Sequence, residues 1–422
     1  MDRDALTVVP EAAAAPTLRP AARANAFRAL RSKPFRWYFA GQIASASGTF
    51  VQATAIGWLV LQLTGSPASL GMVLAAGGVP SLLLGPWGGV VADRVDLRRL
   101  LIGTQITYGL LAALLWVAAV TGRPGVPLVI AVTVAGGLVQ IVDSPARQAF
   151  VAQLVPPADL ASAASVNGVV MNSARVVGPA VAGVLIASVG TTPCFALNGI
   201  SYLAVVAALL AIRPLAATAA APGKTGGVVS ALRYARTRQQ LWLPLTMMAL
   251  VGLLAFNFPV ILPVFAERTF HGTGGTYGLM STMLSIGSVA GSLAVGLIRH
   301  PRRTYLVATS ATFAAALTVT AAAPNLPTAC AALALTGFTA FSFVTMASTA
   351  LQLHSDPSYR GRIMALWVFV YLGTTPIGSV ISGWITDSSG PRAALLVGAA
   401  ACLVATGVAA RVHTPPNPDA AV

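Results

Sequence analysis

The sequence predicts an all-α polytopic membrane protein with twelve transmembrane helices, arranged as two pseudo-symmetric bundles of six. The chain is 56% hydrophobic and only 9% charged, whereas a soluble globular domain carries about 25% charged residues. Apolar stretches long enough for a helix to cross a bilayer recur along the whole chain. Arginine and lysine residues gather in alternate connectors between these stretches, which is the charge pattern of membrane proteins.

The chain begins with a segment, residues 1–34, that is rich in Ala and Pro and ends in a cluster of basic residues. This composition predicts a disordered cytoplasmic tail. The basic cluster acts as a topology signal or, alternatively, binds anionic lipid headgroups. The segment lacks the pattern of a cleavable signal peptide, so we expect the first span to direct membrane insertion.

Twelve apolar spans with short connectors follow this tail. Their predicted limits are 37–62, 69–92, 100–121, 127–146, 161–188, 194–212, 242–266, 276–298, 304–323, 327–352, 363–386 and 392–411. Of the 26 Lys and Arg residues, 22 lie in the two tails or at the even-numbered connectors, and three lie at the odd-numbered connectors. The positive-inside rule therefore predicts a multi-pass protein of the cell membrane with both termini in the cytoplasm.

The longest connector, residues 214–241, divides the chain into two halves. We expect the first bundle at 35–213, the second at 242–411, and a cytoplasmic C-terminal tail at 412–422. The connector ends in a basic amphipathic segment, residues 231–238, which predicts a helix lying on the cytoplasmic interface. A flexible tether is the alternative interpretation of this connector.

Glycine positions indicate that the two halves are copies of each other. A shift of 200 residues places Gly178, Gly183 and Gly190 on Gly378, Gly383 and Gly390, and a shift of 207 places Gly71 and Gly89 on Gly278 and Gly296. Parallel repeats of this kind enclose a substrate site between two halves that rock against each other. The repeat therefore predicts a cavity between the bundles.

Residues 85–99 connect the second and third spans through a short, charged turn, and they carry Gly89, Asp93, Arg94 and Arg98. The pattern Gly-x-x-x-Asp-Arg, followed by an Arg pair, resembles motif A of the major facilitator superfamily. The resemblance implies a conformational latch that stabilises the outward-facing state. In it, Asp93 faces the eleventh helix and the arginines face an acid at the end of the fourth, which here is Asp143. Topology signalling is the alternative role of these charges.

A second pattern, Asp-x-Pro-Ala-Arg-Gln, begins at Asp143 and places Arg147 four residues later, on the same helix face. The later pattern Ala-Arg-x-x-Gly-Pro contains Arg175, Gly178 and Pro179. Together they resemble the facilitator branch that contains the enterobactin exporter and macrolide efflux pumps. The resemblance implies drug:proton antiport, and Asp143 is the candidate for proton coupling because no Asp or Glu lies at mid-span.

Arg175 lies near the middle of the fifth span, where an unpaired guanidinium costs roughly 2.5–3.5 kcal/mol. Such a charge is expected to face the cavity. It either anchors an anionic or carbonyl-rich substrate, or it donates to backbone carbonyls in a glycine-rich helix interface. Gly178 and Pro179, followed by Gly183, resemble motif C of proton-driven exporters, although Ala182 replaces the first glycine of the usual final pair.

Amide side chains at membrane depth are expected either to line the cavity or to hydrogen-bond neighbouring helices together. Gln52, Asn167 and Asn257 are the candidates for the cavity, because the first, fifth and seventh helices face it in the resembled fold. Tyr371 is a further candidate for the cavity wall, and packing in the core is its alternative role.

The sequence therefore predicts a monomeric secondary exporter of small organic molecules such as a drug, an antibiotic or a siderophore. We expect no cofactor or metal, because no zinc spacing, nucleophile–base pair or Walker A loop is present in the sequence. The basic residues form no patch among aromatic residues, which argues against nucleic-acid binding. A nutrient importer of the same fold, and a membrane sensor or enzyme, are the alternatives.

Overall fold

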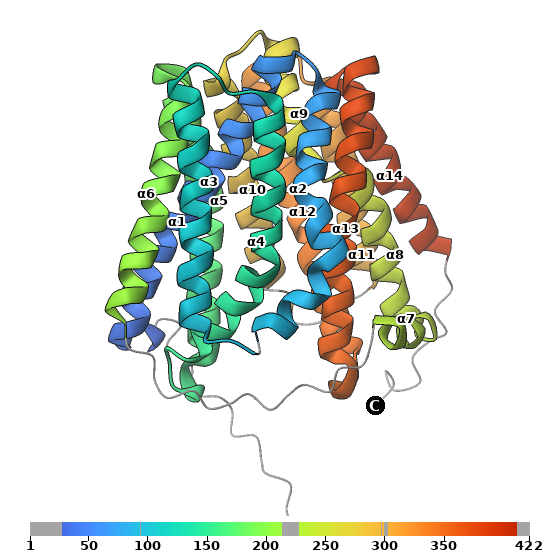
Figure 1. Cartoon of the computed structure of the whole chain (residues 1–422). Helices are drawn as coiled ribbons and strands as arrows, with labels where there is room; N and C mark the ends of the chain where they lie inside the picture. Colours follow the sequence, from blue (N-terminus) through green and yellow to red (C-terminus); the bar gives the residue numbers. More distant parts are fainter. Residues whose placement is uncertain (1–27, 93, 213–227, 297, 299–302, 412–422) are drawn as a thin grey trace, which may run out of the picture.

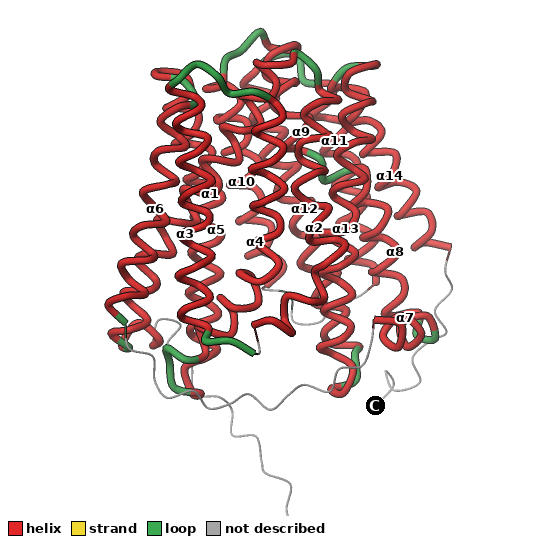
Figure 2. The backbone as a smooth tube through the Cα atoms, viewed as in Figure 1, coloured by secondary structure: helices red, strands yellow, loops and turns green. Residues whose placement is uncertain are grey.

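The computed structural model describes residues 28–92, 94–212, 228–296, 298 and 303–411, and twelve spans in these ranges are long and apolar enough to cross a membrane. The six spans of the first half are α1 (Lys33–Thr64), α2 (Pro67–Ala92), α3 (Leu97–Val120), α4 (Val126–Ala152), α5 (Leu160–Val189) and α6 (Thr192–Ala211). Two short 3-10 turns, Arg28–Arg31 and Pro157–Asp159, precede α1 and α5. The described residues contain no strand (Figure 2).

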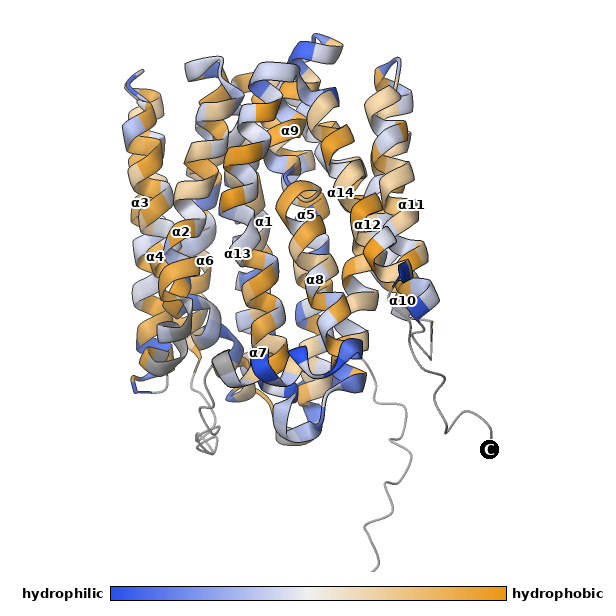
Figure 3. Ribbon diagram, turned by 90° about the vertical axis from the view of Figure 1, so that its right-hand side faces the viewer, coloured by the Kyte–Doolittle hydropathy of each residue, from blue (hydrophilic) through white to orange (hydrophobic). Residues whose placement is uncertain are grey.

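The second half repeats this pattern after a short surface helix, α7 (Val228–Arg236). Its spans are α8 (Gln239–Leu254) continued by α9 (Phe258–Val264), then α10 (Gly274–Gly296), α11 (Arg303–Ala322), α12 (Leu326–His354), α13 (Pro357–Ser389) and α14 (Pro391–Arg411). Hydrophobic residues run along the spans, and hydrophilic residues concentrate at the end where α7 lies (Figure 3). We call this the basic end, and the other is the opposite end.

The seventh span is broken, whereas the sequence predicts one continuous helix over 242–266. The helical pattern stops at Ala255 and resumes at Phe258, and Figure 2 shows the break as a loop segment inside the bundle. Pro259 explains it, because a proline has no N–H to donate and its ring clashes with the carbonyl four residues earlier, that of Ala255. A π-helical turn, Phe265–Thr269, ends the span.

Contacts between helices show the internal repeat in three dimensions. In the first half α1 packs on α5 and α6, α2 packs on α4, and α3 packs on α4 and α6. The second half has the equivalent contacts of α8 with α13 and α14, of α10 with α12, and of α11 with α12 and α14. The two bundles meet where α2 packs on α13 and α5 packs on α10 (Figure 1).

Glycine residues bring these helices together across the bundle interface. A Cβ atom placed on Gly183 of α5 would lie 2.9 Å from the Cα of Gly278 on α10. Likewise, a Cβ atom on Gly383 of α13 would lie 3.2 Å from the Cα of Gly71 on α2. The sequence shifts that relate the two halves convert one of these contacts into the other. Both contacts lie toward the opposite end. They close the bundles against each other at that end, and we call them the glycine seam.

The helix α7 is docked on the start of α13. The Tyr234 ring stacks on the Tyr359 ring with 4.1 Å between centroids, and Arg238 pairs with Asp356 at 3.0 Å. Ala235 on the inner face of α7 is fully buried. The amphipathic segment of the connector is therefore a helix packed at the basic end. Residues 1–27, 214–227 and 412–422 of the predicted tails and connector lie outside the described residues.

We predict that Gly183→Ala destabilises the protein because the added methyl group must displace the α10 backbone, at a cost of about 1–3 kcal/mol. The matched control is Gly407→Ala on α14, where a Cβ atom meets nothing within 4 Å. Thermal unfolding of the purified protein in detergent should show a lower melting temperature for Gly183→Ala alone. Equal melting temperatures would show that the bundles are not held in contact at this point.

Candidate functional site

A cavity of about 950 Å³ lies in the interior of the first bundle. This volume is within the range of pockets that hold small organic molecules. Its lining extends from Gly77 and Gly78 of α2 to Ala152 and Leu160, which lie at the basic ends of α4 and α5. The cavity therefore reaches the basic end, while the glycine seam closes the opposite end.

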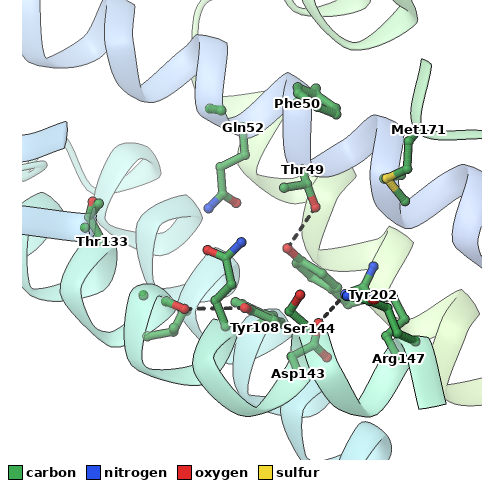
Figure 4. A pocket seen from close by; sticks show the side chains of 18 of the residues that line it. Thr49, Phe50, Gln52, Tyr108, Thr133, Asp143, Ser144, Arg147, Met171 and Tyr202 are labelled. Atoms are coloured by element: carbon green, nitrogen blue, oxygen red, sulfur yellow. Dashed lines mark hydrogen bonds and ion pairs between the residues drawn. The ribbon is translucent and has the colours of Figure 1, made fainter. Parts of the chain in front are cut away.

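Polar side chains from five helices face this cavity (Figure 4). They are Thr49, Gln52, Tyr108, Thr133, Gln140, Asp143, Ser144, Arg147, Gln148, Asn167 and Tyr202. The Tyr108 and Tyr202 rings stack with 5.3 Å between centroids, and the Tyr202 and Thr49 hydroxyl groups are 3.2 Å apart. The cavity thus offers both flat aromatic surface and hydrogen-bonding groups.

Asp143 is the charged centre of the first bundle and is only 2% exposed. Its Oδ1 accepts hydrogen bonds from Thr104 Oγ1 at 2.7 Å and from Gln105 Nε2 at 2.9 Å. Its Oδ2 pairs with the Arg147 guanidinium one turn along α4, and Arg147 also donates to Gln42 Oε1 of α1 at 2.9 Å. Both oxygens of the buried Asp143 carboxylate therefore have hydrogen-bond partners, as a buried charge requires.

Pro145, between these two charges, does not interrupt α4, which runs from Val126 to Ala152. Because proline has no N–H, the Ile141 carbonyl one turn earlier lacks its usual helical donor. That carbonyl faces α2, where a Cβ atom on Gly88 would overlap the oxygen. A glycine of the charged 85–99 segment therefore allows α2 to pack against the proline turn of α4.

The arginines of the motif A pattern do not contact Asp143, in contrast to what the resemblance implies. Arg98 donates from Nε to Leu209 O at 2.7 Å and from Nη2 to Leu210 O at 2.8 Å, at the C-terminal end of α6. Asp143 instead lies beside Thr104, about 9 Å further along α3 at 1.5 Å per residue. Helix-end carbonyls lack intrahelical donors and attract cations, which explains the position of Arg98.

The remaining members of that pattern have different surroundings. Arg94 is exposed in the turn between α2 and α3, and Gly89 lies in the last turns of α2. Asp93, the proposed latch carboxylate, lies outside the described residues. The latch is therefore still a prediction.

Two of the predicted cavity amides line the cavity, and the third does not. Gln52 and Asn167 are lining residues, and Gln52 Oε1 also accepts from Asn198 Nδ2 of α6 at 2.8 Å. Asn257 lies at the break of the seventh span, is 2% exposed, and donates to Leu253 O at 2.8 Å. Pro259 sets this position by ending the preceding helix, so Asn257 packs against Gly378 rather than facing the cavity described here.

Arg175 and Tyr371 lie where the fifth helix meets the second bundle. The Arg175 guanidinium lies over the Phe341 ring of α12, with 4.6 Å from Cζ to the centroid. Tyr371 belongs to the same aromatic cluster, because Phe256 is 6.1 Å from Phe341 and 5.9 Å from Tyr371 between ring centroids. The sequence indicated the depth of Arg175 but not its aromatic partner.

The residues that resemble motif C pack helices together and do not line the cavity. Gly178 faces Phe50 of α1, and a Cβ atom there would lie 3.1 Å from the Phe50 carbonyl carbon. A Cβ atom on Gly278 would lie 2.8 Å from the Pro179 carbonyl oxygen. Gly183 forms the glycine seam with Gly278. Pro179 and Gly183 therefore pack the two bundles against each other, whereas Gly178 packs α5 on α1 within the first bundle.

Polar contacts at the opposite end also link the two bundles, and the sequence analysis missed them. Arg268, after α9, donates to Gly65 O of the first bundle at 2.7 Å. It also lies 3.7 Å from Asp387 of α13, within the second bundle. Ser66 Oγ donates to Asp387 Oδ2 at 3.2 Å. We call these four residues the rim contacts. A clue in the sequence was the presence of an arginine and an aspartate in connectors on the same side.

A scan against family models matches residues 24–421 to a family described as transmembrane secretion effector, within the major facilitator superfamily. The chain belongs to this family of facilitator transporters. It is therefore a multi-pass membrane transporter of small molecules with the major facilitator fold, and it is not an enzyme.

Curated relatives of this facilitator are named as transporters and efflux pumps. It is 26% identical over 266 residues to the staphyloferrin A transporter of Staphylococcus aureus, a match that spans 61% of this chain and 66% of that relative's length. It is 25% identical to the multidrug efflux pump Tap of Mycolicibacterium fortuitum over 84% of this chain and 89% of the relative. The macrolide efflux protein A of Streptococcus pyogenes is also 25% identical, over 84% and 90% of the two chains.

Solved structures show the same fold at low sequence identity. A bacterial homolog of the human lysosomal transporter Spinster, in an inward-facing and unoccupied conformation, has a TM-score of 0.72 at 14% identity, covering 90% of this chain and 97% of the other. The D-xylose-proton symporter has a TM-score of 0.68 at 13% identity, covering 91% and 96%. At these identities the likeness establishes the fold of the facilitator and nothing more specific.

We predict that Arg268→Gln makes the facilitator open more often at the opposite end, because it removes the hydrogen bond from Arg268 to Gly65 O that joins the two bundles. The net loss of about 0.5–1.5 kcal/mol corresponds to a change of roughly 2–12-fold in the open population. The measurement is the rate at which a cysteine placed at Ile186, which is 9% exposed beside Gly274 of α10, reacts with a polar thiol reagent.

The control is Arg392→Gln, which removes a similar 2.9 Å bond from Arg392 to Ala323 O inside the second bundle. It should leave the rate unchanged. The rim contacts have no role in closure if both variants react alike. The native cysteines Cys194, Cys330 and Cys402 are buried and are replaced in the parent protein.

Proposed function

We propose that this facilitator exports small amphiphilic organic molecules from the cytoplasm by alternating access, driven by proton antiport. The observation that carries the proposal is a cavity with mixed aromatic and polar lining that reaches one end of the protein while glycine contacts close the other. The names of the relatives support export as the direction, since a multidrug pump and a macrolide efflux protein match over most of the chain.

The proposed orientation of the protein in the membrane follows from the distribution of its basic residues. In the sequence, 22 of the 26 basic residues belong to the two tails or the even-numbered connectors. The positive-inside rule therefore makes the basic end cytoplasmic, and the described conformation is then the inward-open one. The two rocking units are then residues 35–213 and 242–411, joined by the 214–241 connector, and a monomer suffices for transport. In this state the motif A latch is released, which agrees with the hydrogen bonds of Arg98 to α6.

Asp143 is the proposed site of proton coupling. Its carboxylate holds Arg147, and Arg147 lines the cavity. Protonation of Asp143 would weaken this pair and leave the Arg147 charge to a substrate or to water. Proton binding and substrate binding would then influence each other through one side chain.

We predict that inside-out membrane vesicles with an acidic interior accumulate a macrolide or staphyloferrin A when they contain this protein, and that Asp143→Asn abolishes the response to the pH gradient. The asparagine keeps an acceptor for Thr104 and Gln105 but cannot exchange a proton. Asp356→Asn, which removes a half-exposed carboxylate at the basic end, is the matched control. Gradient-driven release instead of accumulation would identify an importer, and an unchanged response in Asp143→Asn would place coupling elsewhere.

We also predict that both termini face the cytoplasm. Epitope tags placed before residue 1 and after residue 422 should be digested by an external protease only after the cells are permeabilised. A tag inserted at Gly272, in the connector between the seventh and eighth spans, should be digested in intact cells. A protected Gly272 tag together with exposed termini would reverse the proposed orientation.

A further inference from the structure

We infer that Arg175, together with the aromatic side chains of the second bundle that face it, forms a subsite for the negatively charged group of an amphiphilic aromatic substrate. The inference rests on the proposed function, because it gives the chemical class of what the cavity carries. It assigns Arg175 a role in binding and Phe341 a role as the wall that holds the guanidinium in place.

The first argument is the position of Arg175 relative to the cavity. Leu160, Ala164, Asn167 and Met171 of α5 all line the cavity, at spacings of three and four residues. Arg175 is the next position on this helical stripe, one turn beyond Met171. It is half-buried and lies at the middle of the 30-residue α5, one turn deeper than the last α5 residue that lines the cavity.

The second argument is charge balance. Asp143 and Arg147 are both lining residues, and their opposite charges compensate each other in a direct pair. Among the described residues, no carboxylate lies within 4.0 Å of Arg175, and no hydrogen bond joins it to another residue. The region therefore carries one positive charge that the described part of the chain does not neutralise. A substrate with a negative group would neutralise it.

The third argument is donor geometry. A guanidinium has five N–H donors in a planar fork that matches a carboxylate or a sulfonate. Within the described ranges Arg175 contacts the Phe341 ring, and its N–H donors have no hydrogen-bond acceptor there. The ring contact also restricts the guanidinium before the substrate arrives, which lowers the entropic cost of binding.

The fourth argument is the apolar surface on the other bundle. Phe256, at the break of the seventh span, lies 6.1 Å from Phe341, 5.9 Å from Tyr371 and 5.5 Å from Phe313 between ring centroids. Trp367 stacks on Tyr371 at 6.5 Å. The half-buried rings of Phe256, Phe341 and Tyr371 form an edge-to-face aromatic cluster beside the charge, and Phe313 and Trp367 support it from the core. An aromatic acid would place its charged group on Arg175 and its ring on this cluster.

The test uses two fluorescent probes that share one skeleton and differ in charge. They are 8-anilinonaphthalene-1-sulfonate, an anion, and N-phenyl-1-naphthylamine, which is neutral. Binding is measured by fluorescence on the full chain in phosphatidylcholine nanodiscs, with the signal of empty nanodiscs subtracted. No gradient is applied, so the assay reports binding independently of transport.

We expect Arg175→Gln to raise the Kd of the anionic probe by about tenfold or more, which is the usual loss when a hydrogen bond to a charged group is removed. The Kd of the neutral probe should change by less than about twofold, which also shows that the variant is folded. Arg175→Lys should retain part of the preference for the anion, and Phe341→Leu should weaken both probes. Arg392→Gln, at the opposite end, is the control for charge alone.

Equal weakening of both probes by Arg175→Gln would assign Arg175 to packing and overturn the inference. No binding of the anion by the parent protein would overturn it as well. The two proposals fail separately. Binding of the anion through Arg175 without any transport would leave the subsite in place and remove the export function. Export of neutral compounds with no preference for the anion would support the export function and remove the subsite.

Discussion

The close approach of backbone to backbone at the glycine seam is the constraint on which the rest of this structure depends. Gly183 meets Gly278, and Gly71 meets Gly383, at distances that leave no room for a side chain. The two pairs are equivalent under the shifts of 200 and 207 residues that relate the halves in the sequence. One contact is therefore used twice, around a pseudo-twofold axis. This contact closes the opposite end, while the cavity in the first bundle reaches the basic end.

Contacts between bundles in a membrane must be reversible if the protein is to alternate between two states. Lipid tails are as apolar as leucine side chains, so no hydrophobic force holds the bundles together, and packing of small residues takes over that role. The rim contacts between the bundles are two hydrogen bonds, from Arg268 to Gly65 O and from Ser66 to Asp387. They add little, because the Arg268 and Asp387 side chains are 39% and 38% exposed, so water competes for the same groups. Weak contacts of this kind allow a bound substrate or a proton to shift the balance between states.

The sequence alone predicted the elements that depend on local composition. Hydropathy predicted the twelve spans, glycine spacing indicated the repeat, and the four-residue spacing of Asp143 and Arg147 indicated their pairing on one helix face. It did not predict the partners of Arg98 and Arg175, because those partners come from helices more than 100 residues away in the chain and depend on how the bundles are oriented. The break of the seventh span was predictable from Pro259, but average hydropathy over the span concealed it.

The two bundles have the same helix arrangement, but their polar and aromatic residues differ. The buried charges of the first bundle are compensated inside that bundle, between α4, α3 and α1, so they move as one unit when the bundles rock. Breaking a buried ion pair such as Asp143–Arg147 costs about 3–5 kcal/mol. We therefore expect the pair to stay intact during the transport cycle unless Asp143 is protonated. Arg175 differs because its partner, Phe341, belongs to the other bundle. Among the residues that the structure describes, this ring across the interface is the partner of the charge, which makes Arg175 sensitive both to substrate and to the relative position of the bundles. The interface, rather than the interior of either bundle, is therefore where binding can be converted into movement.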